Sequence, residues 1–311
     1  MGSRLGSLLY AAALVMVIGA GCATPRAIPT VASAPAPSAS RSTSSAEGAS
    51  PTEMTLTPSP TSAPSSSRSV SSVRTSTAAA RTTATHATSS ATQGCGIAKS
   101  LLGKDLTVLP VTEKVVALTF DAGANANGVA PILATLAARQ APGTFFLTGA
   151  FVNAFPSASR QVAASYPIGN HTQNHKDLTQ LTTAEVLAEI RTGAASIRNV
   201  TGVDPHPYFR FPYGAVNAST IALVNAECYV PFRWTVDTLG WEGTAGKISA
   251  DVVLQRVVAA LRPGAVVLMH VGSNPDDGTT FDADALPRVI DAIRAQGYTL
   301  VTLERVLPAT P

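Results

Sequence analysis

Residues 114–121 of the chain read KVVALTFD, and this stretch decides the fold. The run VVALTF at residues 115–120 predicts a short strand that is buried on both faces, as the strands of parallel sheets are. The strand ends at the carboxylate of Asp121. In α/β proteins, functional side chains gather at the carboxyl ends of the strands. Asp121 is therefore the first candidate site residue.

Strand and helix patterns alternate after Asp121. Further strands are expected at residues 144–147, 208–211, 229–234, 265–269 and 298–303. Helices are expected at residues 129–140, 183–200, 216–226, 249–261 and 284–296. Thr182 and Glu185 offer a capping box for the second helix. This alternation predicts an α/β fold with a parallel sheet, open or closed into a barrel, and polar residues just after several strands favour the barrel.

The chain begins with a segment that is typical of exported proteins. Within residues 1–21, Arg4 precedes an apolar run that ends in small residues before Cys22. This pattern is similar to a lipoprotein signal peptide, with Cys22 as the lipidated residue. An ordinary secretion signal with an incidental Cys22 is the alternative. In an exported protein Cys95 and Cys228 could form a disulfide, but the sequence does not show whether they come close enough.

Composition separates a tail from a folded part. Residues 22–110 are rich in Ser, Thr, Ala and Pro and predict a disordered tether, whereas residues 111–311 predict one folded domain. The formal net charge of +3 is small and dispersed, so nucleic acid is not an expected partner.

A pair of histidines suggests a metal site. His171 and His175 are four positions apart, and on a helical turn this spacing brings the side chains to one side, about 5–6 Å apart at Cβ. Two converging imidazoles suit Zn²⁺ or a similar divalent ion. Taken alone, such a pair is more commonly an ordinary surface or core pair.

Four other segments strengthen the metal-site interpretation. In chain order they are TFDAG at 119–123, RFPYG at 210–214, VDTLGW at 236–241 and LMH at 268–270. Together with the histidine pair, they resemble the polysaccharide deacetylases of the NodB-like kind over residues 113–305. The resemblance implies a distorted, incomplete (β/α) barrel with an exposed groove.

The resemblance also implies a role for each candidate residue. His171 and His175 would hold the divalent metal ion, expected to be Zn²⁺, which activates water and polarises the acetyl carbonyl. Asp121 would be the general base and His270 the general acid, and Arg210 would orient Asp121 through a bidentate pair. In the segment of Pro212 and Tyr213, the Tyr213 N–H would help hold the oxyanion. Trp241 and Leu268 would form the walls of the acetyl pocket.

Two positions depart from the family pattern. A second Asp, which is a metal ligand in the family, is replaced by Ala122, and Asn125 is one candidate to supply an oxygen instead. An Asp directly before the Trp, which in the family pairs with the acid His, is replaced by Gly240. Asp237 is the one carboxylate in that segment and is the expected substitute.

These features predict a metal-dependent hydrolase that removes N-acetyl groups from an amino sugar polymer, such as peptidoglycan or a chitin-like glycan. We expect a monomer that is exported and either secreted or lipid-anchored to the cell membrane, facing the cell wall. Membrane contact is expected only through the lipid. A catalytically silent glycan-binding module and an O-acetyl esterase are the alternatives.

Overall fold

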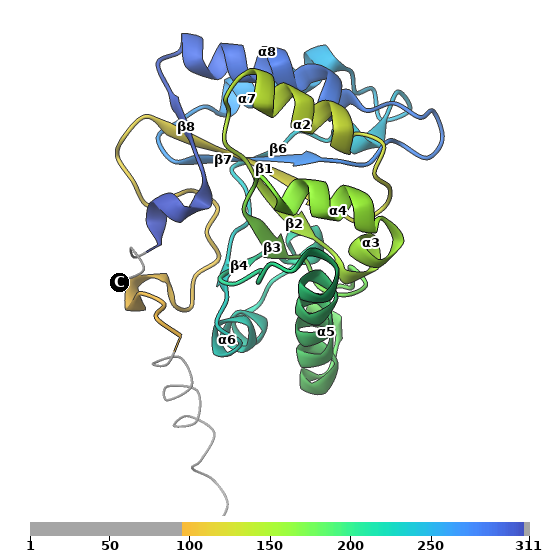
Figure 1. The fold of residues 1–311 in the computed structure, drawn as a ribbon. Coiled ribbons are helices and arrows are strands. Elements are labelled where there is room, and N and C mark those ends of the chain that lie inside the picture. Colours follow the sequence, from red (N-terminus) through yellow and green to blue (C-terminus); the bar gives the residue numbers. More distant parts are fainter. Residues whose placement is uncertain (1–94, 308–311) are drawn as a thin grey trace, which may run out of the picture. The chain divides into compact units, whose positions relative to one another are not determined.

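The computed structural model describes residues 95–307 (Figure 1). The predicted signal segment, the lipidation at Cys22 and most of the predicted tether lie outside the described residues. In the part that is described, no helix is long and apolar enough to cross a membrane.

A parallel sheet forms the centre of the described domain. Its strands are β1 (Val115–Ala122), β2 (Thr144–Leu147), β3 (Ile168–Asn170), β4 (Tyr208–Phe209), β5 (Val230–Pro231), β6 (Val236–Asp237), β7 (Ala265–His270) and β8 (Thr299–Val301). They follow the order β5-β4-β3-β2-β1-β7-β6, and β8 pairs with the first residues of β1. All eight residues of β1 are buried, as the apolar run in the sequence predicts.

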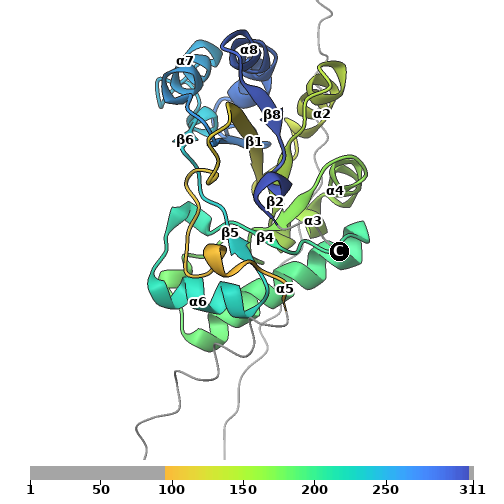
Figure 2. The same cartoon turned by 90° about the vertical axis from the view of Figure 1, so that its left-hand side faces the viewer.

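The helices lie around the strands (Figure 2). They are α2 (Val129–Ala138), α3 (Gly149–Ala154), α4 (Pro156–Ala163), α5 (Thr183–Thr201), α6 (Ala218–Ala226), α7 (Ala250–Ala260) and α8 (Phe281–Ala295). The predicted capping box is present at the start of α5, where Thr182 and Glu185 bond reciprocally. The sheet curls into a half-barrel, so the predicted incomplete (β/α) barrel is confirmed.

The folded part begins before residue 111, so the predicted end of the tether is wrong. Leu101, Leu106 and Leu109 are buried in a cluster with residues of β4, β5 and β7. Leu106 forms a bridge with Phe232 beside β5, and Val108 forms one with Ala265 of β7. This segment therefore spans the gap between two strands that are not neighbours in the sheet. Its short length and its polar surroundings in the sequence hid the three buried leucines.

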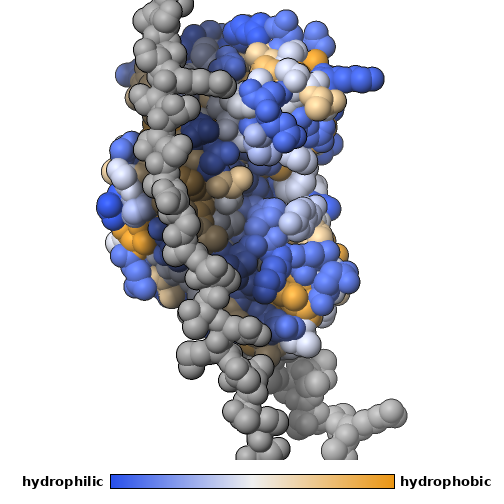
Figure 3. Space-filling view, turned by 90° about the vertical axis from the view of Figure 1, so that its right-hand side faces the viewer, coloured by the Kyte–Doolittle hydropathy of each residue, from blue (hydrophilic) through white to orange (hydrophobic). Residues whose placement is uncertain are grey.

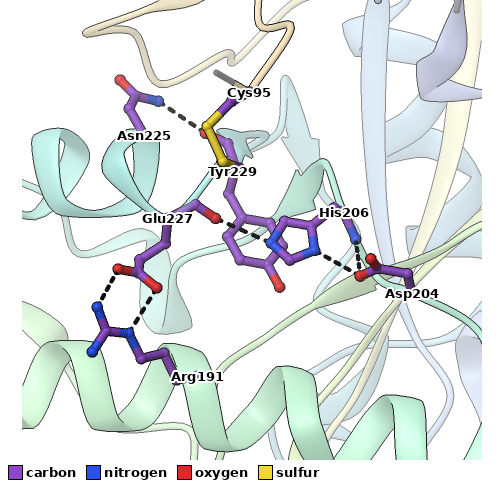
Figure 4. The surroundings of a disulfide bond; sticks show 8 residues. Cys95, Arg191, Asp204, His206, Asn225, Glu227 and Tyr229 are labelled. Atoms are coloured by element: carbon purple, nitrogen blue, oxygen red, sulfur yellow. Dashed lines mark hydrogen bonds and ion pairs between the residues drawn. A yellow bond between two sulfur atoms is a disulfide. The ribbon is translucent and has the colours of Figure 1, made fainter. Parts of the chain in front are cut away.

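The possible disulfide is present. Cys95 is bonded to Cys228 with a Cα–Cα distance of 5.2 Å, and 133 positions separate the two residues in the chain (Figure 4). Cys228 follows α6, and Glu227 beside it forms two hydrogen bonds with Arg191 of α5. The disulfide therefore ties the beginning of the folded part to the packed pair α5 and α6.

We predict that Cys95→Ser lowers the free energy of unfolding by about 4 kcal/mol. The disulfide joins residues 133 positions apart, and this cross-link strongly restricts the unfolded chain. Urea unfolding with and without a reductant measures this loss. The reductant should destabilise the wild-type protein and leave Cys95→Ser unchanged. Equal unfolding midpoints for the oxidised wild type and Cys95→Ser would contradict the prediction.

Candidate active site

Arg210 is the centre of the site at the carboxyl end of β1. Arg210 directly follows β4, and its side chain is fully buried. Nη1 donates to Asp121 Oδ1 at 2.7 Å, and Nη2 donates to Thr119 Oγ1 at 2.9 Å. Nε donates to the Phe232 carbonyl oxygen and Nη2 also donates to the Arg233 carbonyl oxygen, both at 2.9 Å. The predicted Arg210–Asp121 pair exists, but it is not bidentate because the guanidinium divides its donors among several acceptors.

Asp121 lies between a cation and an imidazole. Its second oxygen, Oδ2, is 3.3 Å from Nε2 of His171. Burial alone would raise the pKa of the Asp121 carboxyl, but the positive charges around it, Arg210 first, outweigh burial and lower the pKa. Asp121 is therefore an ionised carboxylate in a largely dry site, as a general base must be.

His171 and His175 do converge, but not on a helix as the sequence spacing suggested. His171 follows β3, and both Thr172 and His175 have positive φ angles, 69° and 56°. The loop is held by Thr172 Oγ1, which accepts the His175 N–H at 3.0 Å. The two rings lie edge to face with centroids 4.7 Å apart. The four-residue spacing correctly predicted that the two rings lie together. The local structure that brings them together is a loop and not the helical turn that was expected.

The surroundings of both imidazoles favour the neutral form, which is the form that binds a metal ion. Burial lowers the pKa of His171, and burial with the nearby His171 lowers the pKa of His175 to about 4. His171 Nδ1 lies 2.8 Å from the Arg210 carbonyl oxygen, so this nitrogen carries the proton and Nε2 keeps a free lone pair. These two side chains fit a divalent cation.

The third metal ligand that the family resemblance leads us to expect is missing. Ala122 lies in the main apolar cluster of the domain, with Leu147 and Phe151. Asn125 is not a substitute, because its amide oxygen and nitrogen bond to the backbone of Ser273. Within residues 95–307, no group of three His, Cys, Asp or Glu side chains is arranged to hold a metal ion. Two imidazoles are therefore the protein ligands that the described residues offer, and water or substrate would have to complete the coordination.

Pro212 and Tyr213 form one side of the site. They lie in the short helix η3 (Pro212–Gly214), where Tyr213 has a left-handed backbone with φ of 59°. Pro212 is buried, but the Tyr213 ring is 70% exposed and packs edge-on against His175 at 4.6 Å. A groove of about 380 Å³ continues from Tyr213 along Trp234 to Asp237, with Arg233 and Arg256 on its walls.

His270 ends β7 on the other side of the site. The register of β1 and β7 pairs Asp121 directly with His270, and it places Leu268 beside Thr119. Leu268 is buried, whereas Trp241 is 48% exposed, with its ring centroid 6.3 Å from that of His270. The predicted base, acid and pocket walls are therefore brought together at one edge of the sheet.

The carboxylate closest to His270 is Asp282, which the sequence analysis missed. Asp282 Oδ2 accepts the His270 backbone N–H at 2.8 Å and lies 3.5 Å from its Nδ1. Asp237, the expected partner, instead uses Oδ1 to accept the Leu239 N–H at 2.9 Å. The predicted α8 began at residue 284, but the helix begins at Phe281, so Asp282 lies in its first turn. An acidic residue before a helical pattern is a common signal of a helix start and could have revealed this position.

The charges around His270 act together on its ring. Burial lowers the pKa of His270, but Asp282, Asp121 and Asp237 outweigh burial and raise it. Asp237 therefore contributes to His270 through charge and not through a hydrogen bond. A raised pKa keeps His270 protonated at higher pH, as a general acid requires.

The fold and this cluster define a class of protein: a parallel α/β half-barrel with a carboxylate, a buried Arg and three imidazoles at the carboxyl edge of its sheet. The family model for polysaccharide deacetylase matches residues 109–230. A peptidoglycan-N-acetylglucosamine deacetylase of Bacillus cereus is 30% identical over 195 residues, which cover 62% of this chain and 68% of the relative. The chain belongs to the polysaccharide deacetylase family.

Two further similarities bear on function. A chitooligosaccharide deacetylase of a Bradyrhizobium species is 32% identical over 189 residues, which cover 60% of this chain and 84% of the relative. Among solved structures, a CE4 family pseudoenzyme from Bacillus anthracis is 26% identical with a TM-score of 0.57, and the match covers 63% of this chain and 66% of that chain. The family thus contains enzymes on two kinds of glycan and at least one inactive member.

We predict that Arg210→Met lowers the free energy of unfolding by about 3–5 kcal/mol, because it leaves the Asp121 charge buried without its partner. The double variant Arg210→Met/Asp121→Leu should lose less stability than the sum of the two single variants. Urea unfolding measures all three. Arg191→Met is the matched control, since Arg191 forms a carboxylate pair with Glu227 through two hydrogen bonds but lies on the surface, and its unfolding midpoint should barely change. Equal losses for Arg210→Met and Arg191→Met would disprove the central position of Arg210.

Proposed function

We propose that the chain is a metal-dependent hydrolase that removes N-acetyl groups from an amino sugar polymer of the cell envelope. The observation that carries this proposal is the register of β1 and β7, which sets Asp121 and His270 side by side. The imidazole pair of His171 and His175 lies against Asp121. A proton acceptor, a proton donor and two metal ligands are the groups that amide hydrolysis needs.

The proposed reaction divides the proton transfers between two sides of the site. Asp121 takes a proton from water, the water oxygen bonds to the acetyl carbon, and the carbon–nitrogen bond then breaks. His270 delivers its proton to the leaving sugar nitrogen, so acetate and a free amine result. Arg210 positions Asp121 and keeps it ionised. The Tyr213 backbone N–H is assigned to the oxyanion, and Trp241 with Leu268 to the acetyl group.

His171 and His175 would hold the cation, which we propose to be Zn²⁺. The bound cation would lower the pKa of water and polarise the acetyl carbonyl. Two features favour binding of the cation: both rings are neutral, and the hydrogen bond between His171 and the Arg210 carbonyl orients the His171 ring. Two nitrogen ligands without the usual carboxylate should bind the cation more weakly than a full family site.

The surface near the site suits a carbohydrate. Figure 3 shows one face of the domain, on which hydrophilic residues predominate and hydrophobic ones are scattered. Among residues 95–307, only three large hydrophobic side chains are exposed: Val203, Tyr213 and Trp241. Tyr213 packs on His175 and Trp241 stands near His270, so two of the three flank the candidate site. Aromatic rings with one exposed face can pack on a sugar ring while polar groups bind its hydroxyls.

The identity of the polymer is proposed from two sources. The relatives act on peptidoglycan or on chitooligosaccharide, according to their names. The predicted export signal, with lipidation at Cys22 or without it, favours peptidoglycan because that polymer lies outside the cell membrane. We therefore propose an exported protein with peptidoglycan N-acetylglucosamine as its first substrate to test.

A glycan-binding module without activity is the second candidate. The loss of the metal carboxylate at Ala122 favours it, and so does the similarity to the Bacillus anthracis pseudoenzyme. Deacetylation of O-acetyl esters is a third possibility, because the same groups attack an ester carbonyl. Acetate release from N-acetylated and O-acetylated polymers, measured side by side, separates the three.

We predict that Asp121→Asn and His270→Ala each reduce acetate release from N-acetylglucosamine oligomers by about 10²–10⁴-fold, because each removes one proton transfer. His206→Ala is the control, since His206 lies beside the disulfide, stacked on Tyr229, and should retain full activity. Circular dichroism checks that all variants fold. Unchanged acetate release by both Asp121→Asn and His270→Ala would refute the assigned roles.

We predict that His175→Ala weakens Zn²⁺ binding by more than about 100-fold, because removal of a ligand exceeds the usual 10–100-fold effect of residues behind the ligands. Equilibrium dialysis with metal analysis measures this without any assay of activity. His206→Ala should bind Zn²⁺ as tightly as the wild-type protein. Equal Zn²⁺ affinity of His175→Ala and the wild type would exclude the proposed metal site.

A further inference from the structure

Gly240 and Asp282 share one volume beside His270. A Cβ atom placed on Gly240 would have three nearest neighbours, and all three are atoms of the Asp282 carboxyl group, with Oδ2 at 2.6 Å. Gly240 does not have a positive φ angle, so its backbone accepts other residues. The carboxyl group of Asp282 is therefore what excludes a side chain at position 240.

The Asp282 carboxylate is a fixed part of the site. It is 3% exposed, and Thr238 Oγ1 lies 2.6 Å from its Oδ1. Its Oδ2 accepts the His270 backbone N–H at 2.8 Å and faces His270 Nδ1 at 3.5 Å. That nitrogen is buried and makes no hydrogen bond in this geometry. Catalytic hydrogen bonds are often long before substrate binds, and a shift of a few tenths of an ångström would complete this one.

Helix α8 supplies this carboxylate from its first turn. The amino end of a helix interacts favourably with a negative side chain, so the start of α8 stabilises the Asp282 charge. Gly240 lies at the start of η4 (Gly240–Glu242), which packs against α8. The two positions belong to different elements, but the carboxyl group of Asp282 fills the space beside Gly240.

We propose that Asp282 is the positioning residue of His270, and that it stands in the space that an acidic side chain at position 240 would occupy. Asp282 orients the imidazole through Nδ1. Its negative charge keeps the ring protonated, so that Nε2 can deliver a proton to the leaving nitrogen. The inference rests on the proposed function, because it assigns the partner of the proposed general acid. The glycine at position 240 is then a consequence of the arrangement and not a sign of lost catalysis.

Other titratable groups also face His270. They are Asp121 on β1, Asp237 on β6, and the two imidazoles of His171 and His175. None of these is changed when Asp282 alone is substituted. The effect of Asp282 on the ring can therefore be measured against a constant background.

The test is a swap of the carboxylate between the two positions. Asp282→Ala and Asp282→Asn should reduce kcat for acetate release by about 10–100-fold with a small change in KM, because the acid is left without its partner. Gly240→Asp in the wild-type background should also reduce kcat, since two carboxyl groups cannot share the volume. The double variant Gly240→Asp/Asp282→Ala should recover activity to at least about threefold above Asp282→Ala. A purely structural Asp282 would give no such recovery.

A second measurement does not depend on activity. Asp282 favours the charged form of His270, so Asp282→Ala should lower the pKa of the ring by about one unit, as followed by NMR. The fall of activity with rising pH should move to lower pH by the same amount. Asp284→Ala is the matched control, because Asp284 is exposed in the same turn of α8 and should change neither quantity.

The outcomes separate the inference from the proposed function. If the wild-type protein releases no acetate but Asp282→Ala lowers the pKa of His270, the proposed function fails and the pairing stands. If the wild-type protein is active and Asp282→Ala has the same kcat and the same His270 pKa, the inference is overturned. A folded double variant that is no more active than Asp282→Ala also overturns it.

Discussion

The hydrogen bonds of Arg210 are the constraint on which the rest of the structure depends. Arg210 follows β4, but it donates to Thr119 and Asp121 on β1, and β3 and β2 lie between these strands. In a flat sheet β4 and β1 would be about 14 Å apart, farther than an Arg side chain reaches. The bonds are possible because the sheet curls. The guanidinium, stacked on Phe146 of β2 at 4.1 Å, fills the interior of the half-barrel.

The same curl sets the chemistry of the site. A buried cation needs a buried anion, and Arg210 therefore keeps Asp121 ionised where burial alone would favour its neutral form. His171 contacts both members of the pair, through Nε2 to Asp121 and through Nδ1 to the Arg210 carbonyl. The orientation of one proposed metal ligand and the charge of the proposed base thus depend on one residue. His270 reaches this cluster from the opposite edge of β1, through the register of β7.

The sequence predicted the elements whose patterns are long. β1, β2, β7 and the five expected helices were all found, and the order of the polar segments predicted the family. The strands expected at residues 208–211 and 229–234 are present as β4 and β5, but each has only two residues, too few for periodicity to define its ends. β3 and β6, with three and two residues, were not expected at all. The loop of His171 and His175 could not be predicted either, because its positive φ angles occur at Thr172 and His175 and not at glycine. The candidate residues were predictable by type, whereas their partners depend on contacts between distant segments.

Gly240 shows how a comparison by position can mislead. Along the chain, a glycine where the resemblance to the family leads us to expect an acid looks like a lost interaction, and Asp237 looks like the nearest substitute. In space, the acid is present but comes from α8, and the Asp237 carboxylate is occupied by the Leu239 N–H. Ala122 has no such compensation, since it lies among apolar side chains and the described residues supply no third metal ligand. The two departures are therefore physically different. At position 240 the missing carboxylate is supplied by Asp282 from another element, whereas at position 122 no described residue supplies one.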